Sequence, residues 1–182
     1  MKTAKSFFIA FGIIFTCFLV CSVFSHAADT TTGKSGPEQG IRQDVEQKLG
    51  ALSQEIGSKR TIGKAAAYDL LSRYLKENPR IYGAALAFAP KKKKGKTVKF
   101  SPYVYRSGNE LIKKDLAKSY NYKSREWYAA PVKKKKPLWS EPYYDEGGGE
   151  TWMVTYSIPV YSSAKRPKLI GVVTSDVIVP KP

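Results

Sequence analysis

The chain has 182 residues, enough for one domain of ordinary size and a targeting segment but too few for a sensor module together with a catalytic module. Lysine and arginine total 31 and aspartate and glutamate total 15, so the formal net charge is +16, while 42% of the residues are hydrophobic. This composition is typical of a folded basic protein and excludes a disordered tail.

The cysteines and the single histidine all lie near the amino terminus, as Cys17, Cys21 and His26. If the leader that contains them is removed, the remaining chain has no thiol and no imidazole. This excludes disulfides, zinc sites of the Cys/His type, c-type haem attachment and Ser-His-Asp catalysis. We therefore expect a protein that is not an enzyme and that carries no cofactor and no metal.

Residues 1–27 have the pattern of an export signal. Lys2 and Lys5 precede the apolar stretch Phe7–Phe24. Ser25-His26-Ala27 then forms a small-x-small cleavage site. The apolar stretch is also long enough for an uncleaved membrane anchor. Both alternatives predict a domain on the periplasmic or extracellular side of a bacterial cytoplasmic membrane, soluble after cleavage and N-terminally anchored without it.

The exported part begins with a flexible linker and two helical patterns. Residues 28–38, rich in Thr, Gly and Ser, form the linker, and residues 39–182 form the domain. Apolar residues recur at intervals of three or four over Gln39–Ile56, which predicts an amphipathic helix. Its nearly heptad stripe serves either a homodimer or the chain's own sheet. A second helix is predicted over Lys64–Glu77, because Pro79 ends the pattern.

Extended patterns follow Pro79. The candidate strands are Ile81–Phe88, Lys99–Arg106, Leu138–Tyr143, Thr151–Tyr161 and Leu169–Val179. Gly147–Gly149 predicts a hairpin connection between two of them. Helices followed by strands predict an α+β domain, with a long N-terminal helix packed on a largely antiparallel sheet of about five strands.

Two lysine runs interrupt these patterns, Lys91–Lys94 with Lys96 and Lys133–Lys136. Clustered like charges need solvent, so the simplest interpretation is two exposed loops. The alternative is a polyanion- or surface-binding role with steeply salt-dependent affinity. Export makes nucleic acid an unsuitable partner, and we expect none.

Aromatic residues concentrate in one part of the chain. Between Tyr103 and Tyr161 lie all three tryptophans and nine of the twelve tyrosines. Such a segment serves either a small-molecule pocket with flat walls and polar tips or a tyrosine-rich core.

Several motifs in this part of the chain occur in an order that resembles a known family. They are Asn78–Ala85, Phe100–Arg106, Tyr120–Tyr128, Trp139–Gly149, Thr155–Pro159 and Gly171–Asp176. Together they resemble an extracytoplasmic Cache domain of the dCache type, as found in bacterial histidine kinases, chemoreceptors and SpoIIE-type phosphatases. The resemblance spans about Gln39 to Val179. It implies a PAS-like sensor domain with a long helix along an antiparallel sheet and a ligand pocket on the sheet's other face.

The resemblance also implies site residues, by position in the signature of the amino-acid-binding members. These are Tyr120, Arg125, Trp127, Tyr128, Tyr143 and Asp176, with Asp145 as an additional acid. An α-amino acid needs a cationic fork for its carboxylate, an anion for its ammonium and a shield from water. Arg125 would hold the carboxylate, and Asp176 with Asp145 the ammonium.

Each assignment has a structural alternative. Arg125 could pair with Glu126 or Asp115 at the surface, Trp127 could be core packing, and Asp145 could cap the glycine turn. Tyr128 and Tyr143 could likewise either contact the ligand or pack in the core. An acid pair at Asp145 and Glu146 would be poor for catalysis, because adjacent strand residues point to opposite faces.

The expected ligand is therefore an amino acid or a related small carboxylate or amine. Family members usually continue into a second sensor module and a cytoplasmic output domain, whereas this sequence ends at Pro182. This departure favours a free-standing binding protein, an accessory subunit or a truncated receptor. The resemblance offers a membrane histidine kinase, chemoreceptor or phosphatase as the signalling partner.

Overall fold

The structure is a computed structural model that describes residues 39–182, so the expected export signal and linker lie outside the described residues. It opens with helix α1 (Gln39–Ser58) and helix α2 (Lys64–Glu77). The second helix has the bounds that the sequence predicts, and the first continues two residues beyond Ile56. Asn78 follows α2 as its C-cap, as expected for a residue before proline.

The rest of the domain is built on an antiparallel sheet. Its seven strands are β1 (Gly83–Phe88), β4 (Pro102–Ser107), β5 (Glu110–Asp115), β6 (Leu138–Trp139), β7 (Tyr143–Tyr144), β8 (Trp152–Tyr161) and β9 (Leu169–Ile178). Their order is β5-β4-β1-β9-β8-β6, with β7 also paired to β8. The α+β class with a helix on an antiparallel sheet is confirmed.

The sheet is larger than the five strands expected from the sequence. β5 was not predicted, because its sequence Glu-Leu-Ile-Lys-Lys-Asp lacks a clear alternation and forms the edge of the sheet. The predicted strand Leu138–Tyr143 is two short strands, β6 and β7. Pro142 lies between them and has no backbone N–H to donate to a neighbouring strand. The remaining predicted strands exist with ends shifted by one to three residues.

Short helices connect β5 to β6 and were also not predicted. They are α3 (Leu116–Ser119), a 3-10 turn (Tyr122–Ser124) and α4 (Glu126–Lys134). α4 contains Pro131, a residue that normally argues against a helix. Lys133–Lys136 covers its end and stays exposed.

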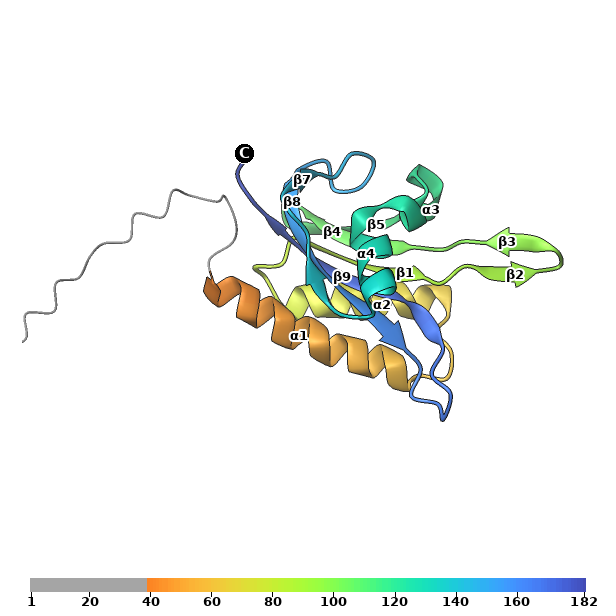
Figure 1. The fold of residues 1–182 in the computed structure, drawn as a ribbon. Helices are drawn as coiled ribbons and strands as arrows, with labels where there is room; N and C mark the ends of the chain where they lie inside the picture. Colours follow the sequence, from red (N-terminus) through yellow and green to blue (C-terminus); the bar gives the residue numbers. More distant parts are fainter. Residues whose placement is uncertain (1–38) are drawn as a thin grey trace, which may run out of the picture. The chain divides into compact units, whose positions relative to one another are not determined.

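The first lysine run is a hairpin and not an irregular loop. β2 (Lys91–Lys93) and β3 (Lys96–Val98) pair as a separate two-stranded sheet, and all six residues are exposed. Lys94 and Gly95 both have positive φ, as a two-residue hairpin turn requires. The hairpin extends away from the main sheet (Figure 1).

The two faces of the main sheet carry two cores. α1 and α2 cover one face, and α3 and α4 lie over the other (Figure 1). The apolar stripe of α1 is buried in the first core, through Val45, Leu49, Leu52 and Ile56. Of the two uses that the sequence left open for this stripe, the structure shows packing on the domain's own sheet, so the stripe is not left exposed for a homodimer.

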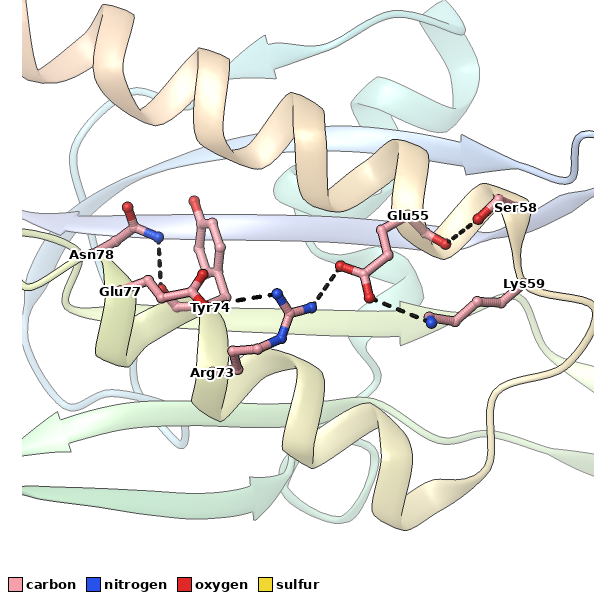
Figure 2. Close-up of polar contacts among 7 residues, drawn as sticks. All are labelled: Glu55, Ser58, Lys59, Arg73, Tyr74, Glu77 and Asn78. Carbon is pink, nitrogen blue, oxygen red and sulfur yellow. Dashed lines mark hydrogen bonds and ion pairs between the residues drawn. The ribbon is translucent and has the colours of Figure 1, made fainter.

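Polar contacts join the two helices along their exposed edge (Figure 2). Arg73 of α2 bonds Glu55 of α1 at 2.6 Å, and Lys59 lies 3.3 Å from the same carboxylate. Solvent-exposed pairs of this kind contribute only about 0 to 1 kcal/mol each. A buried contact ties α2 to the sheet as well: the hydroxyl of Tyr74 lies 2.7 Å from that of Ser175 on β9.

We expect Gly50→Ala to stabilise the domain by about 0.5 to 1 kcal/mol, because an interior helical glycine costs conformational entropy. A Cβ at Gly50 would meet nothing within 4 Å. Urea unfolding should show a higher midpoint with an unchanged slope. Gly57→Ala is the contrasting variant, since its Cβ would lie 2.9 Å from the carbonyl oxygen of Tyr161. Equal effects of the two substitutions would contradict this account.

Candidate functional site

Four neighbouring strands place a row of residues side by side across the sheet. Gly83 of β1 lies opposite Asp176 of β9 and opposite Tyr105 of β4. Asp176 in turn lies opposite Thr155 of β8. Opposed residues on paired strands share a face. This row faces away from α2, because the adjacent Ser175 points toward that helix.

The carboxyl group of Asp176 is buried in this row, with 4% of the residue exposed. Its Oδ1 accepts a hydrogen bond of 2.8 Å from the hydroxyl of Thr155. The hydroxyl of Tyr143 lies 2.8 Å from the same Thr155 oxygen, and because Thr155 already donates its proton, Tyr143 is the donor. Burial raises the pKa of Asp176 to about 8, and the nearby charge of Asp145 adds to the rise. This carboxyl group therefore changes charge near neutral pH.

Gly83 leaves the space that Asp176 and its neighbour Tyr103 occupy. A Cβ on Gly83 would lie 2.9 Å from Oδ2 of Asp176 and closer still to the hydroxyl of Tyr103. That hydroxyl is buried and has no well-formed hydrogen bond within the described residues, yet it is near enough to Asp176 to limit the rise of its pKa. A buried polar atom without a partner costs about 1 to 3 kcal/mol.

A second buried acid comes from the loop between β7 and β8. Asp145 is 7% exposed, and its Oδ2 accepts a hydrogen bond of 2.8 Å from the backbone N–H of Gly149. The hydroxyl of Tyr120 donates a longer bond of 3.4 Å to Oδ1. Burial raises the pKa of Asp145, while the N–H of Gly149 and the charge of Arg125 oppose the rise. Asp145 therefore does cap the glycine turn, and its carboxylate also belongs to the buried acidic group.

Arg125 stands at the edge of this group. It is exposed, it precedes α4 as the N-cap residue, and its guanidinium carbon lies 4.4 Å from the centre of the Tyr120 ring. This cation–π contact holds the charge beside Tyr120 and within electrostatic reach of Asp145. Pairing with Asp115, one surface alternative, is not seen, since Asp115 instead accepts the backbone N–H groups of Ser101 and Ala117.

Trp127 and Tyr128 are buried in the core on this face of the sheet. Their rings meet edge to face at 6.2 Å, and Tyr128 meets Tyr122 in the same way at 5.2 Å. Both rings pack with apolar residues of β1, β4 and β9. The core alternative for these two residues therefore describes their contacts, and any wall that they offer to a ligand is a by-product of that packing.

The structure brings the seven sequence-predicted residues to one face: five form two groups joined by polar contacts, and Trp127 and Tyr128 lie in the core beside them. Tyr120, Asp145 and Arg125 form the first group, and Tyr143 with Asp176 forms the second through Thr155. The charge of Asp145 acts on Asp176, which couples the groups. Both carboxyl groups are closed off from solvent.

Sequence reasoning missed several members of this site. They are Tyr82, Gly83, Tyr103, Gly149 and Thr155. Tyr82 donates a 2.7 Å hydrogen bond to the carbonyl of Gly149 and so ties the β7–β8 loop to β1. The alternating tyrosines 103 and 105 on one strand are the signal that could have placed Tyr103 on the same face as the acids, and their rings stack at 5.3 Å.

Comparison with known proteins places this geometry in a family. The model of the first PDC sensor domain of methyl-accepting chemotaxis protein-like proteins matches residues 67–181, more than half of the chain. The chain belongs to this family. As a PDC sensor domain it has the Cache-type fold that its motifs resemble, and that resemblance is confirmed. No curated protein gives a significant match.

Solved structures of extracellular sensor domains share this PDC fold. The extracellular domain of soHK1S-Z6, assigned as a histidine kinase, is 28% identical with a TM-score of 0.68, over 77% of this chain and 54% of that one. Methyl-accepting chemotaxis protein X is 24% identical with a TM-score of 0.58, over 76% and 58%. The amino-acid chemoreceptor PctC of Pseudomonas aeruginosa PAO1, solved with GABA, is 15% identical with a TM-score of 0.55, over 77% and 58%.

The family match and the solved structures indicate which kind of domain this chain contains. It is an extracellular sensor domain of the chemoreceptor and histidine kinase type. The chain spans only 54% to 58% of the length of these solved structures. Within residues 39–182, no helix combines the length and the apolarity needed to cross a bilayer.

Proposed function

We propose that this PDC sensor domain binds an amino acid, or a related small amine or carboxylate, on the sheet face that carries Asp176. The observation that supports this most is the pair of buried acids, Asp145 and Asp176. Neither forms an ion pair with any residue of the described range. A buried carboxyl group without a cation costs stability. The ammonium of a ligand would offset this cost.

Asp145 and Asp176 would bind the ammonium of the ligand. Asp176 already accepts one hydrogen bond from Thr155, and the unpaired hydroxyl of Tyr103 stands beside its second oxygen. An ammonium has three donors, which Asp176, Asp145 and a tyrosine hydroxyl would accept. Binding of the cation would ionise Asp176, because a nearby positive charge lowers the pKa of a carboxyl group.

Arg125, which lies next to the two acids, would bind the carboxylate of the ligand. Its guanidinium is a planar fork suited to two carboxylate oxygens, and it already stacks on Tyr120. To donate to that carboxylate, the hydroxyls of Tyr120 and Tyr143 would turn their single protons from Asp145 and Thr155 to the ligand. Trp127 and Tyr128 would close the apolar side of the ligand from within the core that they form.

Ligand entry needs an opening, since the acids are covered. The β7–β8 loop provides the cover, held by the Tyr82 bond to Gly149 and by the Gly149 N–H bond to Asp145. The loop contains Gly147, Gly148 and Gly149, and glycine has access to more backbone conformations than any other residue. The loop is therefore the part that we expect to move when a ligand binds.

The signal would pass to a membrane protein of the types that carry related domains. A histidine kinase, a chemoreceptor or a SpoIIE-type phosphatase would be the partner or the continuation of such a domain. The family match and the histidine kinase and chemoreceptor structures support this placement, on the periplasmic or extracellular side of the membrane.

Arg125→Ala should lower the affinity for amino acids and small carboxylates by about 10- to 100-fold, because it removes a charge-assisted bidentate contact. The affinity for simple amines should stay the same. Isothermal titration calorimetry of the purified protein against amino acids, small carboxylates and amines measures this. Lys123→Ala is the matched control, since it removes an equal exposed charge two residues away. Unchanged affinity in Arg125→Ala would place the carboxylate elsewhere, and no binding of any tested ligand would remove the proposal.

A further inference from the structure

A cavity of about 600 Å³ opens at the far end of the sheet from the buried acids. It lies where the α1–α2 loop, the β2–β3 hairpin and the β8–β9 loop gather (Figure 1). We call it the cationic groove. Its lining includes the basic residues Lys59, Arg60, Lys64, Lys91 and Lys168. It shares no residue with the acidic site.

The floor of the groove is apolar and partly open to solvent. Phe88 and Phe100 stack with ring centres 5.7 Å apart and planes at 13°. Val98 at the base of the hairpin is 47% exposed, although valine is an apolar residue. Ile62 and Ile170 are half-buried against the main core beside them. An apolar surface of this kind inside a hollow gains free energy when another apolar group covers it.

The charged residues at the rim of the groove are all basic. Five basic residues line it, and no acid does. Within the described residues, only Lys59 has an ion-pair partner, Glu55 at 3.3 Å. Lys64 instead places its ammonium 5.1 Å from the centre of the Phe100 ring. Like charges held at one rim repel one another, and a bound anion would relieve that repulsion.

The neighbouring hairpin adds to this charge at a cost to its own stability. Lys93 lies directly opposite Lys96 in the β2–β3 pair. Like charges facing each other across strands are destabilising. Lys91 ends the hairpin at the groove itself, opposite Val98. The hairpin therefore brings positive charge to the mouth of an apolar hollow.

We propose that the cationic groove binds an amphiphilic anion, with a carboxylate or phosphate head among the lysines and an apolar tail on Phe88, Phe100 and Val98. The volume is within the range of small-molecule sites. A polyanion would use the charged rim but not the apolar floor, and an uncharged lipid would use the floor but not the rim. Only a ligand with both parts matches the whole lining. This proposal is independent of the acidic site.

The test is calorimetry of the purified protein with decanoate, decyl phosphate, decanol and inorganic phosphate, at concentrations below micelle formation. We expect the two decyl anions to bind, and decanol and inorganic phosphate to bind at least about tenfold more weakly. Octanoate should bind more weakly than decanoate, by about fourfold for each methylene group that the floor no longer covers. The carboxylate and phosphate arms distinguish a fatty-acid head from a phosphate head.

Charge and apolar variants separate the two halves of the groove. The double variant Lys64→Glu/Lys168→Glu should weaken decanoate binding about tenfold or more, since it reverses two rim charges. Val98→Glu should do the same by placing a carboxylate on the floor, and its exposed position leaves the fold intact. The double variant Lys133→Glu/Lys136→Glu is the control for net charge, because both residues are exposed and outside the groove.

Three outcomes would overturn the proposal. Decanol could bind as tightly as decanoate, Val98→Glu could leave decanoate binding unchanged, or Lys133→Glu/Lys136→Glu could weaken it as much as Lys64→Glu/Lys168→Glu does. The last two results, together with tight binding of a long polyphosphate, would show that the protein binds anions through its positive charge alone, without the apolar floor. Amino-acid titrations of the same variants should match the unaltered protein, so failure of the groove and failure of the acidic site can be told apart.

Discussion

Asp176→Asn should make the protein more stable at pH 8 by about 2 to 4 kcal/mol and nearly unchanged at pH 4. The pKa of Asp176 is raised from 3.8 to about 8 by burial. Between these values the unfolded chain loses the proton first, so the contribution of this group to stability is complete below pH 4 and is lost as the pH rises to 8. An amide has no proton to lose and keeps the stability. Urea unfolding of both proteins at several pH values measures the difference.

The same substitution should abolish binding of ligands that carry an ammonium, because the amide supplies no negative charge. For the unaltered protein, affinity for such ligands should rise with pH up to about 8, since the cation needs the ionised carboxylate. Binding at pH 7 should therefore release protons, seen as a calorimetric heat that depends on the buffer. Asp69→Asn, at an exposed acid on α2, is the control. A variant that is both less stable and fully able to bind would show that Asp176 is structural.

The gain in stability and the loss of binding come from one cause. A buried acid is a poor choice for a core but a good one for a cation site. Asp145 is in the same position to a smaller degree, because the backbone N–H of Gly149 and the charge of Arg125 counter its burial. The two acids therefore differ in what a ligand would change: Asp176 would gain its first positive partner, while Asp145 already has a positive charge within reach.

The periodic parts of the fold could be predicted from the sequence. The stripe of α1 and the bounds of α2 follow from spacing and from Pro79, and these hold because packing on the sheet uses the same period. α4 and β5 could not be predicted. Pro131 makes the sequence of α4 look unsuited to a helix. The charged residues of β5 make it look unsuited to a strand, although pairing with β4 holds it at the edge of the sheet. In both, tertiary contacts outweigh local preference.

The acidic site was partly predictable for a similar reason. Motif order supplied Arg125, Asp145 and Asp176, whose residue types stand out along the chain. Gly83 and Tyr103 did not stand out, because their roles depend on the register that sets Gly83 opposite Asp176, far away in sequence. Pairing register is a property of the folded sheet, and alternation along one strand does not contain it.

The cationic groove was even less predictable from the sequence than the acidic site. The sequence predicted the Lys91–Lys94 run as a loop or as a polyanion surface. Its apolar floor is assembled from Phe88, Val98, Phe100 and Ile170, which come from three separate segments of the chain. Charge runs are visible in a sequence, but the surface beneath them becomes visible only when the strands are paired.

Gly83→Ala should remove ligand binding at the acidic site and lower the free energy of unfolding by about 1 to 3 kcal/mol. The new methyl group would need the place of the Tyr103 hydroxyl and would press on Oδ2 of Asp176. Tyr103 is buried and stacked on Tyr105, so its ring has little freedom to withdraw. Calorimetry of ligand binding and urea unfolding test both effects.

A double-mutant cycle with Tyr103→Phe isolates the contact. Removing the hydroxyl eliminates a buried atom without a partner and the nearest obstacle to the methyl group, so Gly83→Ala should cost less in the Phe background. A ring carbon of Tyr103 would still lie 2.8 Å from the Cβ, so part of the cost should remain. Equal costs in both backgrounds would mean that Gly83 serves the backbone of β1 alone, and then its position beside Asp176 would have no part in shaping the site.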